Sequence, residues 1–567
     1  MDTPRRLPLG YANFAKIRAQ NRIFADKTRL IYELITEDTP FFLSRPRRFG
    51  KTLLVSVLKA IFEGRKDLFK GLWIYDQEYD WAPHPVIRLS LATAQNDTPE
   101  DLKNSLNYKL NLIASKEKIK LEPGAPADLF LALVQGLNLK YGESVAILID
   151  EYDAPILAHL DNTDLAVKIR KTLKDFYGAL KDCEDERCFV FITGVSKFAK
   201  TSLFSGLNNL TDLTLEKKFA NILGFTIEEF DHLFKEHMEE TLNEFISANS
   251  IEAIKTVADL KAKILGWYDG YSWDGKSSVL NPWAVLTFFR KREFDNYWLE
   301  TGHPGFLENM IKTGQITISD IFHKNFFTNS MNVIDIGAKL NLKALLFQTG
   351  YLTVARTEFT DEGAYYFLNF PNLEVKTSIA QLCLSLEDPI KKPLLLVTQG
   401  KAILETLINR DADGFRLAFQ SFISNLSCRV FTYNENFYSM MFTLAIIFSG
   451  QLCEPQKEVA GGVMDLHFRS RYGDDFVIEF KYVPLPSTED DNYESRKKEL
   501  MEKARDKAFE QIERKRYYFC FQGGGNKIFK TALIFGGRSE ILVDFQEARN
   551  WILEWDEKSR VYAVKET

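Results

Sequence analysis

The sequence predicts an α/β protein with a parallel sheet in its first third, a helical middle and a second, smaller α/β domain at its C-terminus. In the first third, short apolar runs alternate with segments of helical periodicity, which is typical of a parallel sheet with crossover helices. From about residue 226 the pattern becomes mostly helical and rich in aromatic residues. Strand-like alternation returns after residue 462, so we expect the chain to end in a separate sheet. In this part we also expect a helix with Leu500, Ala504, Ala508 and Ile512 on one face, strands at 517–521 and 531–535, and a turn at 523–526.

The apolar runs of the first third set the order of the predicted strands. The third run is continuous and ends in acids, which is the mark of a strand buried on both faces. A helix is expected after the first run, because Leu54, Leu58 and Phe62 recur every four residues. The predicted strands cover 41–44, 86–91, 145–149 and 188–192.

Length and composition narrow the classes of protein that the chain can represent. Its 567 residues exceed what one hydrophobic core organises, so we expect several domains. The net charge of −6 argues against a uniformly basic coat for nucleic acid, although local basic patches are compatible with it. The six cysteines include no C-x-x-C pair, which argues against a disulfide framework and against a zinc site.

No segment predicts insertion into a membrane. The N-terminus lacks the apolar core of a signal peptide. The longest apolar stretch, at 440–448, is too short to span a bilayer. We therefore expect a cytoplasmic protein without a membrane partner.

A phosphate-binding loop is predicted where the first strand meets the first long helix. Gly50 lets the backbone approach an anion, Lys51 can reach β- and γ-phosphates, and the Thr52 hydroxyl can ligate Mg²⁺. The usual first glycine of such a loop is replaced by Arg45. Gly-Lys-Thr alone is a weak signal, so an ordinary helix start is the alternative. The residues expected to contact the nucleotide are Arg45, Pro46, Arg47, Arg48, Phe49, Gly50, Lys51 and Thr52.

Two acids at the end of the third predicted strand support the nucleotide site. In P-loop ATPases the first acid holds Mg²⁺, which assigns metal and nucleotide binding to Asp150. We expect Glu151 to polarise the attacking water. Thr193 ends the next strand and suits a polar sensor beside the γ-phosphate, although Thr-Gly is also a common strand exit. Together these features predict a site that binds and hydrolyses ATP with Mg²⁺.

A hairpin near the C-terminus brings together residue types that suit phosphodiester hydrolysis. Asp465 lies on its first strand, and Glu479 and Lys481 share one face of the second because side chains alternate along a strand. The carboxylates would hold Mg²⁺ as hard oxygen ligands. Lys481 would orient the nucleophile or neutralise the transition state. A solvated hairpin face with one Glu/Lys pair is the alternative.

Residues on the flanking helices extend this candidate site. Glu435 lies on the preceding helix and is an additional candidate metal ligand beside Asp465 and Glu479. Gln511 lies on the following helix and could face the same cleft, as a further catalytic residue. Either residue could instead be on the plain surface. His467 shares the strand face of Asp465, but a packed or exposed histidine is the favoured interpretation.

The sequence resembles the AAA-ATPase-like proteins of bacteria and archaea that carry a C-terminal PD-(D/E)XK nuclease superfamily domain. The resemblance covers nearly the whole chain. Its most specific part is the block at 43–52, and it makes Arg45 the family's own variant of the loop. The other matching blocks are 24–28, 149–153, 193–197, 267–271, 281–283, 297–298, 350–353, 371–375, 465, 479–481 and 511–512.

Pattern and resemblance together predict a division into domains. A helix followed by a hairpin at 340–370 is compatible with a winged-helix module. The family often has Gly-Arg-x-Asp at the first nuclease strand, where Val463 replaces the arginine; this loss would weaken phosphate binding and leave the carboxylates intact. The predicted parts are a P-loop AAA-like ATPase domain at 1–222, a helical lid at 223–300, a winged-helix-like module at 301–383, a helical connector at 384–428 and a PD-(D/E)XK nuclease-like domain at 429–567.

Three functions are compatible with these residues. The first is an enzyme in which ATP acts as a switch for a Mg²⁺-dependent nuclease. The second is a signalling or scaffold ATPase whose nuclease fold binds nucleic acid without cleaving it, and the third is an interaction protein with a vestigial nucleotide site. For the first, the resemblance suggests DNA as the substrate, a role in nucleic-acid processing or defence, and a homo-oligomer.

Overall fold

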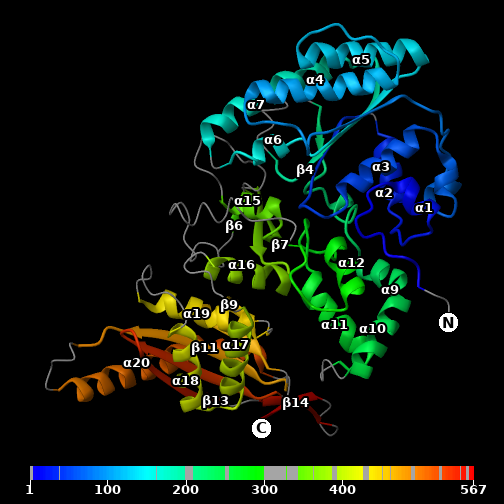
Figure 1. The fold of residues 1–567 in the computed structure, drawn as a ribbon. Coiled ribbons are helices and arrows are strands. Elements are labelled where there is room, and N and C mark those ends of the chain that lie inside the picture. Colours follow the sequence, from blue (N-terminus) through cyan, green and yellow to red (C-terminus); the bar gives the residue numbers. More distant parts are fainter. Residues whose placement is uncertain are drawn as a thin grey trace. The chain divides into compact units, whose positions relative to one another are not determined.

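A computed structural model gives the fold of the chain (Figure 1). It divides into two compact units, the first formed by Met1–Phe306 and Asn325–Val375, the second by Leu307–Lys324 and Lys376–Thr567. The structure describes residues 4–37, 39–160, 162–197, 209–248, 254–298, 327–328, 342–361, 363–385, 393–424, 433–449, 451, 453–459, 462–470, 472–486, 492–522, 526–548, 551–556 and 561–566.

The first unit is built on a five-stranded parallel sheet, as the sequence predicted. The strands are β1 (Phe41–Ser44), β2 (Val86–Ser90), β3 (Val145–Asp150), β4 (Arg187–Gly194) and β5 (Thr211–Asp212). Their order is β2-β3-β4-β1-β5, and every pairing is parallel. The strand that ends in the acid pair is therefore not the direct neighbour of the strand before the loop, because β4 lies between them.

Helices cover this sheet and begin at residues that favour helix starts. Helix α3 (Lys51–Phe62) packs against β2, β3 and β4. Helices α4 (Pro99–Lys116), α5 (Pro126–Tyr141) and α7 (Thr163–Asp182) pack beside one another (Figure 1). The N-caps of α4 and α7 are Thr98 and Asn162, whose side chains accept backbone N–H groups. The shorter helices are α1 (Phe14–Ala19), α2 (Thr28–Ile35) and α6 (Ala154–Leu157).

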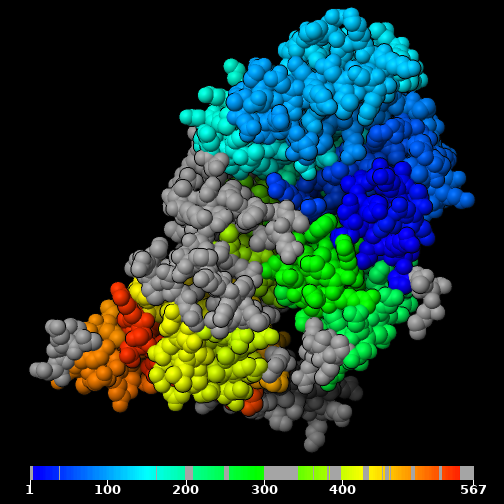
Figure 2. Space-filling view, viewed as in Figure 1, coloured from blue at the N-terminus to red at the C-terminus, as the bar shows by residue number. Residues whose placement is uncertain are grey.

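A helical segment with an aromatic core follows the sheet. It contains α9 (Ile227–Leu233), α10 (Lys235–Ala248), α11 (Val257–Tyr268) and α12 (Pro282–Lys291). Thr226 and Thr256 begin α9 and α11 with reciprocal capping boxes. Apolar residues of the N-terminal segment, among them Ile23, join this core. In Figure 2 the dark blue N-terminal residues accordingly lie directly beside the green helical segment.

The region expected to form a winged-helix module contains a helix followed by a hairpin. Helix α15 (Leu342–Thr349) precedes β7 (Thr353–Thr360) and β8 (Gly363–Asn369), and β6 (Phe327–Thr328) pairs with β8. Helix α16 (Leu373–Ser385) follows. Residues 301–326, 329–341 and 362 of the expected module lie outside the described residues. The winged-helix assignment therefore stays a prediction.

The second unit contains a mixed five-stranded sheet between two sets of helices. The strands β9 (Glu454–Val459), β10 (Gly462–Arg469), β11 (Asp475–Val483), β12 (Ile528–Gly536) and β13 (Glu540–Glu547) lie in the order β13-β12-β11-β10-β9. Only the β11–β12 pairing in this sheet is parallel. Helix α20 (Tyr493–Lys515) connects these two strands and packs on both. A separate hairpin, β14 (Trp551–Asp556) and β15 (Val561–Glu566), follows.

Two helices in the region predicted as a connector, at 384–428, belong to the core of this second unit, together with the helix that begins at Glu435. Helices α17 (Pro393–Ile408), α18 (Ala412–Ser424) and α19 (Glu435–Phe448) share one hydrophobic cluster with the sheet. Phe419 of α18, for example, contacts Phe535 of β12 with ring centroids 5.5 Å apart. The apolar periodicity of the predicted connector thus reflects a face that packs on the sheet.

Two local predictions for this unit were wrong. The segment Tyr517–Phe521, expected as a strand, is the 3-10 helix η5, because Arg516 takes a left-handed conformation that turns the chain. Leu500, expected on the buried face of α20, is 37% exposed, and Met501 takes its place at 6% exposure. The predicted turn at 523–525 lies outside the described residues.

The helices of the described residues were compared with the length and hydropathy of a membrane-spanning helix. Within the described residues, none of them combines the length and the apolar character that crossing a bilayer requires.

Candidate functional site

The loop between β1 and α3 places a lysine on backbone carbonyls. Gly50 adopts φ +96° as the N-cap of α3, a conformation that favours glycine. The Lys51 Nζ donates to the carbonyl oxygens of Arg45 and Pro46, both at 2.8 Å, and the side chain is 5% exposed. Burial lowers the pKa of Lys51 to about 8, although Asp153, Glu151 and Asp150 act to raise it. The ammonium is thus held over the loop by neutral partners.

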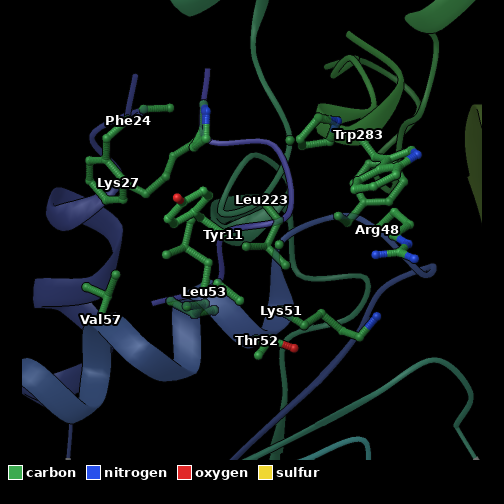
Figure 3. A pocket seen from close by; sticks show the side chains of 18 of the residues that line it. Tyr11, Phe24, Lys27, Arg48, Lys51, Thr52, Leu53, Val57, Leu223 and Trp283 are labelled. Atoms are coloured by element: carbon green, nitrogen blue, oxygen red, sulfur yellow. The ribbon is translucent and has the colours of Figure 1, made fainter. Parts of the chain in front are cut away.

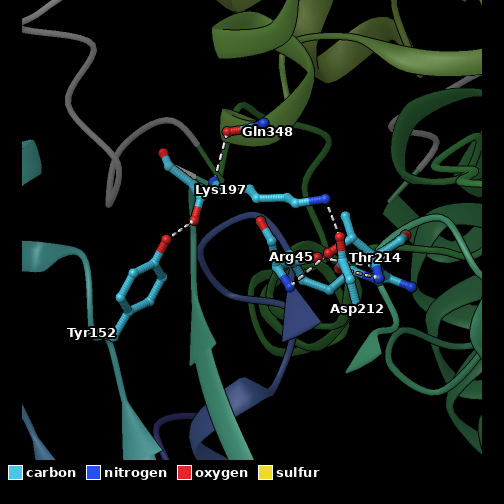
Figure 4. Close-up of polar contacts among 8 residues, drawn as sticks. Arg45, Tyr152, Lys197, Asp212, Thr214 and Gln348 are labelled. Carbon is cyan, nitrogen blue, oxygen red and sulfur yellow. Dashed lines mark hydrogen bonds and ion pairs between the residues drawn. The ribbon is translucent and has the colours of Figure 1, made fainter. Parts of the chain in front are cut away.

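Arg45 supports the loop from behind and does not face a ligand, contrary to the prediction that it contacts the nucleotide. Its guanidinium is fully buried and donates to the carbonyls of Ser44 and Thr214 at 2.9 Å and of Phe219 at 3.1 Å (Figure 4). It also stacks over the Trp273 ring at 4.0 Å. Burial lowers the pKa of Arg45 to about 9. An arginine can replace the expected glycine because its side chain is turned into the protein.

Aromatic residues from later in the chain enclose the rest of the loop. The Phe49 ring packs against Tyr271 and Trp273, with centroids 4.8 and 5.5 Å apart. The Arg48 guanidinium lies 4.3 Å over the Trp283 ring. The sequence blocks at 267–271 and 281–283 therefore meet at the loop.

The sequence blocks at 297–298 and 350–353 also contact the loop. The Trp298 Nε1 donates to the Arg47 carbonyl at 3.2 Å. Pro46 packs against Gly350, where an added Cβ would lie 2.7 Å from the Pro46 Cβ. A side chain at Gly350 would thus displace the loop, and φ +93° also favours glycine there.

The acid pair lies at the edge of the sheet that faces the loop. Asp150 is 1% exposed, and its Oδ1 has no hydrogen-bond partner. Glu151 takes φ +52° and lines the cavity described below. Thr193 pairs with both Asp150 and Leu43 in the sheet, but its hydroxyl donates to the Leu43 carbonyl at 2.8 Å. The predicted sensor hydroxyl is therefore engaged with the β1 backbone.

Asp153 is a buried acid to which the sequence analysis assigned no role. Its carboxylate accepts the backbone N–H groups of Val195, at 3.0 Å, and Ser196, at 2.6 Å. Burial raises the pKa of Asp153 to about 6, against these hydrogen bonds and Lys51. An added Cβ at Gly194 would lie 2.3 Å from the Asp153 carboxylate. Asp153 therefore fixes the segment that leaves β4 next to the loop.

A second polar cluster continues from that segment. Lys197, 8% exposed, forms an ion pair with Asp212 of β5, and its backbone N–H donates to the Gln348 Oε1 at 2.8 Å (Figure 4). Asp212 also acts on Arg45, whose pKa it raises against the effect of burial. The end of β4, the base of the loop and α15 are thus connected by buried polar contacts.

A cavity of ≈ 500 Å³ opens beside the loop (Figure 3). Lys51, Thr52, Arg48 and Glu151 give it a polar end. Its apolar wall comes from the N-terminal segment, α3 and the helical segment, through Tyr11, Phe24, Leu53, Val57, Leu223 and Trp283. This contribution of the N-terminal segment was not predicted, although the block at 24–28 was an available signal.

In the second unit, the predicted carboxylates and lysine come together on the sheet face that α20 covers. Glu479 is fully buried, and its Oε1 lies 2.7 Å from the Lys481 Nζ. The Asp465 carboxylate accepts the Phe480 N–H at 2.8 Å, where β10 and β11 stop pairing. Burial raises the pKa of Glu479 to about 8, and Asp465 adds to this, while Lys481 opposes it. For Lys481, burial acts to lower the pKa, but Glu479 and the other carboxylates raise it.

The flanking helices bring Glu435 and Gln511 to the same region. Glu435 begins α19 after the N-cap Asn434, and its Oε1 lies 4.0 Å from the Lys481 Nζ. Burial raises the pKa of Glu435, and Asp465 contributes in the same direction. The Gln511 Nε2 donates to the Tyr517 hydroxyl at 3.5 Å. Tyr517, which the sequence analysis did not single out, is close enough to Glu479 and Asp465 for both to raise its pKa, after burial.

His467 belongs to a separate cluster, as expected for a packed histidine. Its Nε2 lies 2.9 Å from the Asp475 Oδ1, and its ring stacks on Phe521 with centroids 4.0 Å apart. Arg469 donates twice to the same carboxylate. Burial acts to raise the pKa of Asp475, but the histidine and the arginine outweigh it and lower the pKa.

The fit of the acids to a metal ion is partial. In the part of the chain that the structure describes, no three His, Cys, Asp or Glu side chains stand close enough to share a metal. Glu479 nevertheless has an Oε2 without a hydrogen-bond partner, and a buried carboxylate of this kind needs a cation. Lys481 supplies that cation to the other oxygen.

The first unit has a five-stranded parallel sheet, a loop with a lysine that leads into α3, and an acid pair at the end of β3, two strands away from β1. These features define an ATPase-like domain. The mixed sheet with its Asp, Glu and Lys cluster defines a second domain of nuclease type. Comparison agrees, since residues 8–204 match the family model described as Predicted AAA-ATPase and residues 433–545 match that of the PD-(D/E)XK nuclease superfamily.

A curated relative extends the similarity to most of the chain. The chain is 31% identical over 489 residues to the "Uncharacterized protein in vnfD 5'region" of Azotobacter chroococcum mcd 1, covering 85% of this chain and 90% of the relative. The chain therefore belongs to the AAA-ATPase-like proteins with a C-terminal PD-(D/E)XK nuclease superfamily domain.

Proposed function

We propose that the protein binds and hydrolyses ATP with Mg²⁺, and that its C-terminal domain hydrolyses phosphodiester bonds in nucleic acid, with DNA as the expected substrate. The observation that best supports the ATPase proposal is the Lys51 ammonium, buried on two neutral carbonyls beside a cavity of ≈ 500 Å³. A triphosphate offers that ammonium charged oxygens, which are stronger hydrogen-bond partners than carbonyls.

The residues around the loop have complementary roles in this proposal. The free N–H groups at the start of α3 bind the phosphates together with Lys51. The Thr52 hydroxyl and Asp150 would hold Mg²⁺, and the unpartnered Asp150 Oδ1 suits an oxygen ligand of that ion. Bound Mg²⁺ would neutralise charge on the phosphates. Glu151, which lines the cavity, orients the attacking water.

The apolar part of the cavity suits the nucleotide base. Its aromatic wall includes Tyr11, Phe24 and Trp283, and planar rings favour stacked or edge-on contacts with a base. Arg48, stacked on Trp283, lies at the boundary between this wall and the polar end. The helical segment that contributes Trp283 would thereby act as the lid of the site.

In the nuclease-type domain, Asp465 and Glu479 would hold Mg²⁺, with Glu435 as an additional ligand. Bound Mg²⁺ would activate water and stabilise the charge that grows on the phosphorus. Lys481 then has to leave Glu479 in part and face the nucleophile or the transition state. Gln511 and Tyr517 line the same region and could position the strand.

The alternative function, a scaffold ATPase that binds nucleic acid without cleaving it, is favoured by one observation. Lys481 already contacts Glu479 at 2.7 Å, and burial raises the pKa of that acid to about 8. A carboxyl group that keeps its proton at neutral pH is a poor ligand for Mg²⁺. Cleavage therefore requires that the metal displace this proton.

A cleavage assay separates the two functions. The full-length protein is incubated with labelled single- and double-stranded DNA and RNA, with Mg²⁺ or Mn²⁺, with and without ATP. We expect cleavage that Lys481→Ala abolishes and that Lys498→Ala, at an exposed position of α20, preserves. Binding without cleavage would favour the scaffold function, and neither binding nor cleavage would refute both.

A further inference from the structure

Helix α20 ends in two cations with different surroundings. Arg514 and Lys515 both lie in its last turn, where positive side chains interact favourably with the helix dipole. Arg514 is exposed, whereas Lys515 is half-buried. A Cβ added to Gly462 would lie 3.6 Å from the Lys515 Nζ. The ammonium of Lys515 thus rests against the first residue of β10.

The space beside Gly462 connects Lys515 to the acid cluster. The same added Cβ would lie 3.8 Å from the Tyr517 Cε1. Tyr517 is 2% exposed and close enough to Glu479 and Asp465 to feel both charges. Gly462 precedes Asp465 by three strand residues, which corresponds to roughly 10 Å. Lys515 of α20 therefore contacts the strand that carries Asp465, at a residue whose Cα lies roughly 10 Å along the strand from that of Asp465.

Lys515 differs in its ion pairing from three other lysines of this domain. Lys481, Lys497 and Lys530 each form an ion pair with a glutamate. Lys515 takes part in none of the ion pairs formed among the residues that the structure describes. Its neighbour across the gap, Val463, is exposed and uncharged. Among the side chains that the structure describes, none forms an ion pair that would neutralise the positive charge of Lys515.

We propose that Lys515 binds a backbone phosphate of the nucleic-acid strand, beside the bond that the acid cluster hydrolyses. This inference rests on the proposed nuclease function. Gly462 has no side chain that would fill the space between the ammonium and the strand.

The acids of the site explain why a cation is needed at this position. The acids Asp465, Glu435 and, once it has lost its proton, Glu479 repel the phosphates of an approaching strand, and Lys481 offsets only one of these charges. An unpaired cation beside the cluster attracts the strand and releases a counterion from it. Lys515 is a positioning residue, because it touches the substrate away from the reacting atoms. Its loss should raise KM and leave kcat little changed.

A salt titration measures this contact directly. The full-length protein binds a labelled 20-nucleotide duplex DNA in EDTA, which prevents cleavage, and fluorescence anisotropy gives the affinity at several salt concentrations. Lys515→Gln is expected to reduce the slope of log affinity against log salt by about 0.9, the value of one phosphate contact. Lys515→Arg should restore it. Arg514→Gln removes a cation from the same turn and should leave the slope unchanged.

The outcomes distinguish this inference from the proposed function. If the protein binds DNA but Lys515→Gln has the slope of the wild type, the inference is overturned and the nuclease proposal stands. If Arg514→Gln lowers the slope equally, the effect belongs to the helix end and the inference is also overturned. If the wild type binds neither the duplex nor its single strand, both proposals fail. Thermal melting verifies that each variant is folded.

Discussion

The two candidate sites of this protein bury a lysine in different ways. In the nucleotide loop, Lys51 donates to two neutral carbonyls, and burial lowers its pKa to about 8. In the C-terminal domain, Lys481 contacts the buried Glu479 directly, and the carboxylates raise its pKa although burial acts to lower it. Only Lys51 can exchange its partners for an anion without leaving a buried carboxylate unpaired.

This difference separates a site prepared for an anionic ligand from one that is neutralised internally. A buried cation with carbonyl partners gains from a phosphate, because charged acceptors form the stronger hydrogen bonds. A buried ion pair has to be broken before either partner can act, and breaking it is costly. In the proposed function, an anion would bind the first site by replacing the carbonyl partners of Lys51, and the second site would depend on an incoming cation.

The largest expected effect is that of Glu151 on the rate of ATP hydrolysis. Glu151→Gln removes the carboxylate that orients the attacking water, so ATP hydrolysis should fall about 1,000-fold while ATP affinity changes little. Phosphate release and fluorescent-nucleotide binding measure the two quantities. Glu184→Gln, at an exposed position of the same unit, is the control. Hydrolysis at the wild-type rate in Glu151→Gln would remove this residue from the mechanism.

The next effect compares the two lysines through stability. Lys481→Met removes the cation beside the buried Glu479, so it should destabilise its unit by up to about 3 kcal/mol above pH 8, where the wild type has the ion pair. The double variant Glu479→Gln/Lys481→Met should recover most of this loss, because no buried charge remains. Lys51→Met should cost little, since its partners are neutral carbonyls. Calorimetric unfolding tests all three, and equal losses for Lys51→Met and Lys481→Met would break the comparison.

The pH dependence of the two sites should have different origins. The pKa of Lys51 is lowered from 10.5 to about 8, so the ammonium needed for phosphate is lost as pH rises through about 8. ATP affinity should then fall up to about tenfold per pH unit. Lys51→Arg should keep its affinity over this range. Binding that is independent of pH between 7 and 10 in the wild type would contradict the lowered pKa.

For Glu479 the folded-state pKa is raised from 4.5 to about 8. The folded state therefore binds more protons than the unfolded state in this window. The contribution of the group to stability is full below about pH 4.5 and is lost as pH rises through about 8. Glu479→Gln should flatten the loss of stability of this unit between pH 5 and 8, as followed by thermal melting. A profile as steep as that of the wild type would assign the loss to other groups.

The smallest expected effect concerns Asp153. Its carboxylate accepts the N–H groups of Val195 and Ser196, and Asp153→Asn would turn an amide donor toward one of them. We expect kcat for ATP hydrolysis to fall about fivefold with little change in KM, because the segment beside the phosphates shifts. Asp182→Asn, on the exposed end of α7, is the matched control. A change in KM alone would show that Asp153 supports binding only.

Local signals allowed much of the fold to be predicted from the sequence. The first strand was predicted at 41–44 and observed as Phe41–Ser44, because an apolar run before a helix start has few other solutions. The C-terminal hairpin, with Asp465 facing Glu479 and Lys481, was likewise found from alternation along the strands.

Long-range contacts explain what could not be predicted. Arg45 was assigned to the nucleotide from its position in the loop. The partners of its side chain, Thr214, Phe219 and Trp273, are far away in the sequence and leave no local signal. The position of β4 between β1 and β3 is a property of the sheet and leaves no trace in either strand. Tyr517–Phe521 was predicted as a strand because an aromatic run indicates burial but does not distinguish a 3-10 turn from an extended segment.

The most direct test of the central claim is a calorimetric titration of the full-length protein with ATP and Mg²⁺. We predict one bound nucleotide per chain in the wild type and in Lys59→Ala, which changes a lysine on the outer face of the same helix. Lys51→Ala should weaken binding at least about 100-fold, the effect of losing a charged hydrogen bond in a buried site. No binding to the wild type, or equal affinity in Lys51→Ala, would contradict the assignment of this loop to ATP.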